Sequence, residues 1–199
     1  MDDIVKQAMA KWPNVPDCYG WLALDARGAW RMRDERAQQL NLPGDKVHQA
    51  ALLAFINRNY EADERGCWYF QNGPQRVFVN LEATPYIART DPALGLTVQT
   101  GATLVPQAAC LTEHGSLIVT TDQFVAQVDD RDMAQLLAAL KLDGHAASDE
   151  DVMGWLESGA GQMQLCMGAV PVTVERIAAD SLAARFGFER LPGPGPAAA

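Results

Sequence analysis

The sequence lacks the patterns that identify a membrane span or a common catalytic or nucleotide-binding site. It has no apolar run of about eighteen residues, which excludes a transmembrane helix. The acidic start, Met1–Lys6, has neither the positive region nor the apolar stretch of a secretory signal, so we expect a cytoplasmic protein. Glycine-rich phosphate loops, H-E-x-x-H, G-x-S-x-G and the EF-hand loop are all absent. The familiar enzyme classes are therefore disfavoured.

Histidine and cysteine are scarce and scattered. The three histidines are far apart in sequence, which weakens any Ser-His or Cys-His nucleophile scheme. The four cysteines form no C-x-x-C motif and should stay reduced in a cytoplasmic protein. Cys110 and His114 have a C-x-x-x-H spacing, but no second half of a zinc site follows. We therefore expect a buried thiol and a turn histidine there, and no metal or cofactor.

Positive charge is rare in the second half of the chain. The net charge is −9, and residues 1–98 contribute −1, from 11 Lys and Arg against 12 Asp and Glu. Residues 99–199 contribute −8, from 5 against 13. Nucleic-acid binding usually needs a basic stripe, so neither nucleic acid nor an anionic membrane is an expected partner. The arginines between Arg27 and Arg36 alternate with acids, a pattern typical of a solvated strand face.

The second half of the chain repeats the pattern of the first. Three blocks carry the repetition. Leu24–Trp30 matches Leu111–Leu117 (offset 87), and Leu52–Ile56 matches Val152–Leu156 (offset 100). In the third block, Trp68–Gly73 matches Met163–Gly168 and Val77–Val79 matches Val172–Val174 (offset 95). The offsets change between blocks, as insertions and deletions in loops allow. The repetition predicts architecture and no chemistry.

Apolar spacing, caps and turn residues predict the elements. Helices are expected over residues 3–12, 35–40 and 46–60, from Asp129 or Asp130 through Leu140, and over 152–157 and 180–186. Ser148 to Asp151 resembles a capping box before the fifth of these. Strands are expected over residues 19–24, 29–33, 67–71, 76–82, 96–100, 109–112, 116–121, 124–128, 163–166 and 170–177.

These elements predict an α+β fold. Each half reads hairpin, helix, hairpin, so we expect two pseudo-repeated units in which antiparallel sheets pack against helices. The expected division is an N-terminal helix and turn (1–16), a first repeat (17–90), a connector (91–108), a second repeat with a closing helix (109–190) and a disordered tail (191–199). Whether the repeats share one core is open at this point.

The hairpin from Trp68 to Glu82 is the candidate recognition surface. Consecutive aromatic residues at 68–70 must place rings on both faces of a sheet, because side chains alternate along a strand. The candidate ligand- or partner-binding residues are Trp68, Arg76, Phe78, Asn80 and Glu82, since aromatic rings beside arginine are typical of recognition surfaces. The competing interpretation, which we favour, is that the rings are core. No catalytic residue is predicted.

Several segments resemble one bacterial family. They are Lys11–Pro16, Gly20–Leu22, Gly28–Trp30 and the hairpin from Trp68 to Pro85. Together they resemble an uncharacterised proteobacterial family of domain-of-unknown-function proteins built of repeated strand–helix–strand motifs. The resemblance covers residues 10–90 well and the remainder only through the repetition. It implies a signalling or ligand-responsive role and brings no catalytic residues.

The leading functional hypothesis is a non-enzymatic ligand- or protein-binding regulatory module. Its partner would be a small molecule in a groove between the repeats, or a protein on the face of Arg76 and Phe78. The alternative is an enzyme of unrecognised type with its site in the cleft between the repeats. A homodimer is also compatible with the sequence.

Overall fold

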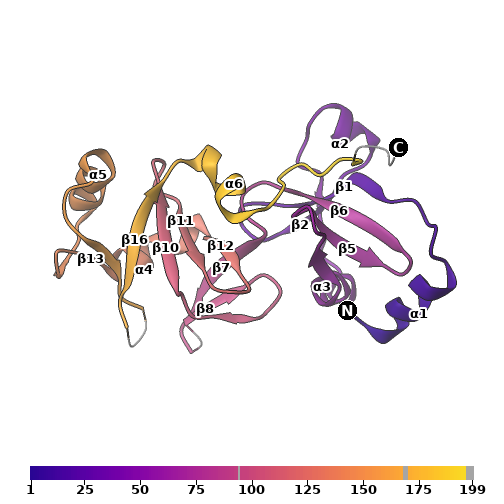
Figure 1. Cartoon of the computed structure of the whole chain (residues 1–199), viewed down its shortest axis with the longest axis horizontal. Coiled ribbons are helices and arrows are strands. Elements are labelled where there is room, and N and C mark those ends of the chain that lie inside the picture. Colours follow the sequence, from indigo (N-terminus) through magenta and orange to yellow (C-terminus); the bar gives the residue numbers. More distant parts are fainter. Residues whose placement is uncertain (94, 168–169, 196–199) are drawn as a thin grey trace. The chain divides into compact units, whose positions relative to one another are not determined.

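The protein has an α+β fold that divides into two compact units. The structure is a computed structural model, and it describes residues 1–93, 95–167 and 170–195 (Figure 1). Unit 1 contains residues 1–85 and 187–195, and unit 2 contains Tyr86–Phe186. The end of the chain therefore returns to the unit in which the chain begins.

The described residues of unit 1 form a six-stranded sheet and three helices. In chain order the elements are α1 (Asp3–Lys11), β1 (Cys18–Leu24), β2 (Trp30–Met32), α2 (Glu35–Gln39), β3 (Asp45–Lys46), α3 (Ala50–Arg58), β4 (Tyr60–Ala62), β5 (Trp68–Asn72) and β6 (Gln75–Leu81). The strand order is β3-β2-β1-β6-β5-β4, and β1 runs parallel to β6.

Both faces of the unit 1 sheet carry packed aromatic rings. Helix α3 lies against one face, where Phe55 meets Phe70 edge to face at 5.3 Å between ring centroids (Figure 1). On the other face Tyr69 and Phe78 are a cross-strand pair, and Tyr19 stacks on Phe78 at 4.7 Å. The predicted distribution of aromatic rings over both faces is confirmed.

The described residues of unit 2 form a ten-stranded sheet with short helices. The elements are β7 (Tyr86–Asp91), β8 (Gly95–Val98), β9 (Thr103–Leu104), β10 (Ala108–Thr112), β11 (Leu117–Thr120), β12 (Val125–Val128), a 3₁₀ turn (Asp130–Asp132), α4 (Met133–Leu137), β13 (Leu140–Leu142), β14 (His145–Ala146), α5 (Asp149–Ser158), β15 (Met163–Leu165), β16 (Val172–Ile177), a second 3₁₀ turn (Ala179–Ser181) and α6 (Leu182–Phe186). The strand order is β14-β13-β15-β16-β10-β11-β12-β7-β8-β9.

The first hairpins of the two units have the same register. Leu24 lies opposite Trp30 in β1–β2, and Leu111 lies opposite Leu117 in β10–β11, with both partners 87 residues later. The turns also agree: Gly28 and Gly115 have φ of 77° and 78°, a region that glycine adopts without steric cost. Equivalent sequence blocks therefore form equivalent hairpins.

The parallel pair at the centre of each sheet follows the same offsets. Leu22 of β1 lies beside Val79 of β6, and Ala109 of β10 lies beside Val174 of β16. The predicted purely antiparallel sheets are therefore wrong, because each unit joins its two hairpins through a parallel pair. The parallel pairing was not predicted because strands that are far apart in the chain leave no local sequence signal of their pairing.

Two predicted helices are shorter than expected. The helix predicted over residues 46–60 begins at Ala50 and ends at Arg58, because Asp45–Lys46 pairs with β2 as β3 and Tyr60 begins β4. The helix predicted to reach Leu140 ends at Leu137. Leu140 lies instead in β13, where it is fully buried opposite Leu165.

The helix N-caps predicted from the sequence are confirmed at three positions. Asp34 caps α2 through a hydrogen bond from the Ala37 N–H at 2.7 Å. Ser148 and Asp151 form the predicted capping box at the start of α5. Asp129 caps the first 3₁₀ turn by accepting from the Arg131 N–H.

Further differences concern the connector and the tail. The predicted connector over 91–108 contains β8, where a strand over 96–100 was predicted, and also the short strand β9, which was not predicted. Arg65 donates to the carbonyl of Gly193, so the first residues of the predicted tail lie on unit 1. Residues 196–199 and Gly168, the predicted counterpart of Gly73, lie outside the described residues.

Candidate functional site

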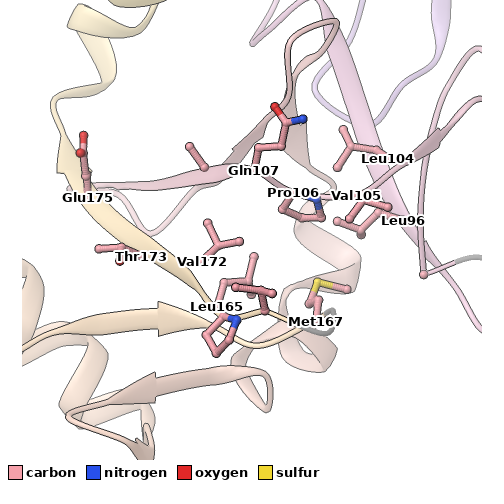
Figure 2. A pocket seen from close by; sticks show the side chains of 14 residues that line it. Leu96, Leu104, Val105, Pro106, Gln107, Leu165, Met167, Val172, Thr173 and Glu175 are labelled. Atoms are coloured by element: carbon pink, nitrogen blue, oxygen red, sulfur yellow. The ribbon is translucent and has the colours of Figure 1, made fainter.

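Unit 2 contains an apolar cavity of about 700 Å³ (Figure 2). Two distant parts of the sheet form its wall: β8, β9 and the segment that leads into β10, together with β15, β16 and the described residues Met167, Val170 and Pro171 between them. The lining residues are Gly95, Leu96, Leu104, Val105, Pro106, Gln107, Ala108, Leu165, Met167, Val170, Pro171, Val172, Thr173 and Glu175. The ten-stranded sheet is therefore curved, because strands near its opposite ends face the same space.

The cavity lies where the parallel ladder of unit 2 begins. The β10–β16 pairing starts at Ala109 and Val174. Immediately before these residues, β10 is paired with β11 and β16 with β15, as Ala108 opposite Thr120 and Val172 opposite Leu165 show. Residues 107–108 and 172–173 therefore belong to two separate hairpins, and the space between the hairpins is part of the cavity.

Aliphatic side chains dominate the lining. Leu96, Leu104 and Leu165 are almost fully buried, so the inner wall is fixed by packing. Val105 and Val170 are 69% and 75% exposed, although each is a large apolar residue. Exposed aliphatic residues beside a concave apolar surface are typical of a ligand site.

Polar side chains interrupt this aliphatic lining in two places: Gln107 lies near Leu104, and Thr173 and Glu175 lie farther away (Figure 2). Figure 2 shows Leu104 and Val105 at one end of the labelled side chains and Glu175 at the opposite end. Glu175 pairs with Arg185 at 3.3 Å, and both side chains are more than half exposed. Gln107 accepts a hydrogen bond from the Asp122 N–H through Oε1 at 3.1 Å.

Cys110 lies next to Glu175 but is not a reactive thiol. It is the cross-strand neighbour of Glu175 and is 6% exposed. Burial and, to a smaller extent, the Glu175 carboxylate raise the pKa of Cys110. A thiol with a raised pKa is mostly protonated at neutral pH and is a poor nucleophile.

The structure separates the residues of the predicted recognition surface. Phe78 is 1% exposed beneath Tyr19, so it is core and cannot contact a partner. Arg76 lies over the Tyr69 ring at 4.8 Å from its centroid, and this cation–π contact covers Tyr69. Asn80 lies beside Ala23 in the β1–β6 pair. These three residues occupy one strand without forming a cavity together.

The other two predicted residues have structural contacts. Trp68 belongs to the α3 face of the sheet, where its ring lies 4.8 Å from that of Tyr60. Glu82 follows β6, and its Oε2 accepts a hydrogen bond from the Ala26 N–H in the β1–β2 turn at 2.9 Å. Glu82 therefore holds a turn in place.

Arg76 does border a second, smaller cavity, in unit 1. This cavity of about 430 Å³ is also lined by Asp63, Arg65 and Tyr69. Asp63 accepts from two backbone N–H groups and from Arg65 Nε, and Arg65 also donates to Gly193. Asp63 and Arg65 therefore hold the loop between β4 and β5 and the returning end of the chain. Of the two arginines that line this cavity, only Arg76 takes no part in these hydrogen bonds.

The cavity in unit 2 could not be predicted from the sequence, because its wall combines segments that are far apart in the chain. One signal was available: Val105-Pro106 and Val170-Pro171-Val172 are aliphatic segments broken by proline, and each comes just before a strand. Proline limits hydrogen-bonded pairing, so such segments favour open edges. Their joint position could not be read from spacing.

An acidic cluster in unit 2 has a structural explanation. Asp129 is fully buried and is paired with Arg131 and Arg89, while Asp132 is paired with Arg89 and accepts from the Thr90 N–H. Burial opposes ionisation of Asp129, but hydrogen bonds from Arg131 outweigh it and lower its pKa to about 2. Within the part of the chain that is described, no group of three His, Cys, Asp or Glu side chains could hold a metal ion.

Comparisons with known proteins agree with an uncharacterised family. A family model described as "Protein of unknown function (DUF2946)" matches residues 1–193. No curated protein matches. Among the described residues, no helix is long and apolar enough to cross a membrane.

Two solved structures are similar to the chain. A DUF1285 family protein from Silicibacter pomeroyi DSS-3 has 11% sequence identity and a TM-score of 0.50, over 87% of this chain and 88% of that one. A second DUF1285 family protein, from Shewanella baltica OS155, also has 11% identity, with a TM-score of 0.36 over 58% of this chain and 88% of that one. The first likeness shows a related fold only.

Proposed function

This chain belongs to the family described as "Protein of unknown function (DUF2946)", and we propose that it is a non-enzymatic module that binds a small apolar molecule in the cavity of unit 2. The observation that carries the proposal is the cavity itself. Its volume of about 700 Å³ lies within the roughly 300–1,000 Å³ of small-molecule sites, and aliphatic side chains line most of it.

We also infer that the two units arose from one hairpin–helix–hairpin unit. The shared register of the β1–β6 and β10–β16 pairs, at the offsets read from the sequence, supports this. Under this inference the elements found in both units are scaffold. Strands β8 and β9, which contribute to the cavity wall, precede the first hairpin of unit 2 and have no counterpart strand before β1. The proposed site therefore includes β8 and β9, two strands that unit 2 has in addition to the elements shared by both units.

The position of the cavity suggests how binding would have a regulatory effect. A ligand there touches β8 and β9 on one side and the β15–β16 hairpin on the other. Binding to the folded state alone raises stability in proportion to the logarithm of ligand concentration. Occupancy would therefore hold together the parts of unit 2 that are not joined by strand pairing.

A binding assay with an uncharged, solvatochromic apolar dye tests the proposal. We expect saturable binding with one site per chain, together with a rise in melting temperature. Ala108→Phe adds a ring to an exposed alanine of the lining and should abolish binding. Ala146→Phe is the matched control, an exposed strand alanine of unit 2 outside the lining, and should bind as the unchanged protein does. Equal binding by both variants would refute the cavity as the site.

The enzyme alternative has no specific observation in its favour. Among the described residues of the lining, Glu175 is the titratable side chain, and general acid–base chemistry usually needs a positioned pair. We therefore propose binding without catalysis. Cytoplasmic location and self-association remain predictions, and sedimentation of the purified chain at several concentrations would test the second.

A further inference from the structure

The cavity of unit 2 is mostly aliphatic, and its acidic side chain lies at one end (Figure 2). Glu175 is this side chain, and Leu104 and Val105 lie at the opposite end. Such a lining matches an amphiphile, a molecule with an apolar chain and a polar head, better than a uniformly apolar compound. The charge at the acidic end then decides which head group is accepted.

The charge of the lining and the net charge of unit 2 both disfavour an anionic ligand at this end. Among the described lining residues the charged side chain is a carboxylate, Glu175, and no lysine, arginine or histidine lines the cavity. Residues 86–186 contain 5 Lys and Arg against 13 Asp and Glu, so unit 2 carries a net charge of −8. A carboxylate or phosphate head would meet repulsion from Glu175 and from the field of the whole unit.

Arg185 pairs with Glu175, and this pairing does not remove the preference. The Arg185–Glu175 pair has side-chain exposures of 61% and 64%, so solvent screens it and its contribution to stability is small. A ligand cation held in the cavity by its apolar chain can replace Arg185 at little cost. The carboxylate is then paired with the ligand instead of with a freely moving surface side chain.

We propose that the ligand of this cavity is a cationic amphiphile, an aliphatic amine or quaternary ammonium compound whose head pairs with Glu175. This inference rests on the proposed function, because it assigns a head group to a ligand of the same cavity. It adds a selectivity that the apolar lining alone does not supply: cation over neutral head, and neutral head over anion.

Three probes with the same decyl chain test the selectivity: decyltrimethylammonium, 1-decanol and decanoate. Calorimetry at pH 7.5 and low salt, below the micelle concentrations, should give the tightest binding for the ammonium compound, about fivefold over decanol, as one exposed ion pair at low salt allows. Decanoate should bind more weakly than decanol. If decanol or decanoate equals or exceeds the ammonium compound, the head-group assignment is wrong while the apolar site stands. If none of the three binds, the proposed function itself fails.

Variants at the ion pair separate recognition from general charge. Glu175→Gln should remove the advantage of the ammonium compound over decanol. Glu157→Gln makes the same change of net charge at an exposed position of α5 outside the lining, and should leave the advantage intact. Arg185→Ala should strengthen binding of the ammonium compound by removing its competitor. An equal effect of Glu175→Gln and Glu157→Gln would overturn the assignment.

Discussion

At the residue scale, the buried carboxylate of Asp129 is the most consequential charge in unit 2. It is fully buried and accepts from the backbone N–H and the guanidinium of Arg131, and Arg89 lies within 3.6 Å. Sequence spacing predicted only its capping role, because Arg89 comes from a different strand. The ion pair between Asp129 and Arg89 of β7 could not be predicted from sequence spacing, because the two residues are far apart in the chain.

Asp129→Asn should lower the free energy of unfolding at pH 7 by about 2 kcal/mol, since the pKa of Asp129 falls from 3.8 to about 2 on folding. A folded-state pKa below the unfolded value stabilises the protein above pH 3.8, and this stabilisation is lost as pH falls towards 2. Urea titrations between pH 7 and pH 2.5 should therefore converge for the two proteins at the acid end. Asp122→Asn, at an exposed aspartate, is the control and should follow the unchanged protein throughout.

Gly66 is the glycine where a side chain is least tolerable. Its φ is +76°, and a Cβ there would lie 2.1 Å from the carbonyl oxygen of Gly187, on the returning chain end. Gly66→Ala should cost about 3 kcal/mol or more, from left-handed backbone strain together with the clash. Gly73→Ala has a similar φ of +57° with its nearest atom 4.0 Å away, so it should cost about 1 kcal/mol. Chemical denaturation of both variants measures the difference, and equal losses would show that the chain end does not lie there.

At the element scale, both units join the first turn to the end of the last strand. In unit 1 Glu82, after β6, accepts from the Ala26 N–H in the turn. In unit 2 the roles are exchanged, and Glu113 of the turn accepts from the Ala179 N–H after β16. The offset of 87 residues relates Ala26 to Glu113, so the same connection is kept while the carboxylate changes side.

Elements with local signals were predicted well, and elements without them were not. The turn glycines Gly28 and Gly115 and the capping box at Ser148 act within a few residues, so the sequence shows them. Strands of two or three residues, such as β4, β9 and β14, have no recognisable pattern and exist because a neighbouring strand pairs with them. The cavity combines such elements, so it could not be anticipated.

The capping box offers a test at this scale. Ser148→Ala should lower the free energy of unfolding by about 1 kcal/mol, because it leaves the Asp151 N–H without its side-chain acceptor at the start of α5. Ser181→Ala, at an exposed serine after β16, should cost less than about 0.5 kcal/mol. Thermal unfolding followed by circular dichroism compares them. If Ser148→Ala had no effect on stability, α5 would be held by the packing of Val152 and Trp155 instead of by its cap.

At the scale of the whole molecule, the chain crosses from unit 1 to unit 2 and returns. The return is built from specific contacts: Phe188 is buried, the Glu189 N–H donates to the Gly66 carbonyl, and the Leu81 N–H donates to the Arg190 carbonyl. The sequence suggested two sequential repeats followed by a tail. It could not show that residues after Phe186 complete unit 1, because the contacts span more than a hundred residues of sequence.

Phe188→Ala should therefore weaken unit 1 selectively. Removing a buried ring costs about 3 kcal/mol or more, and Phe188 is a residue of unit 1. Native-state hydrogen exchange should show faster exchange of amides in β5 and β6 and unchanged exchange in β10 and β11, because separate compact units open independently. Leu191→Ala, at a 69% exposed leucine three residues later, is the control and should leave both sets unchanged. Faster exchange in all four strands would mean that the two units unfold as one cooperative structure, and the division into two compact units would then lose its energetic basis.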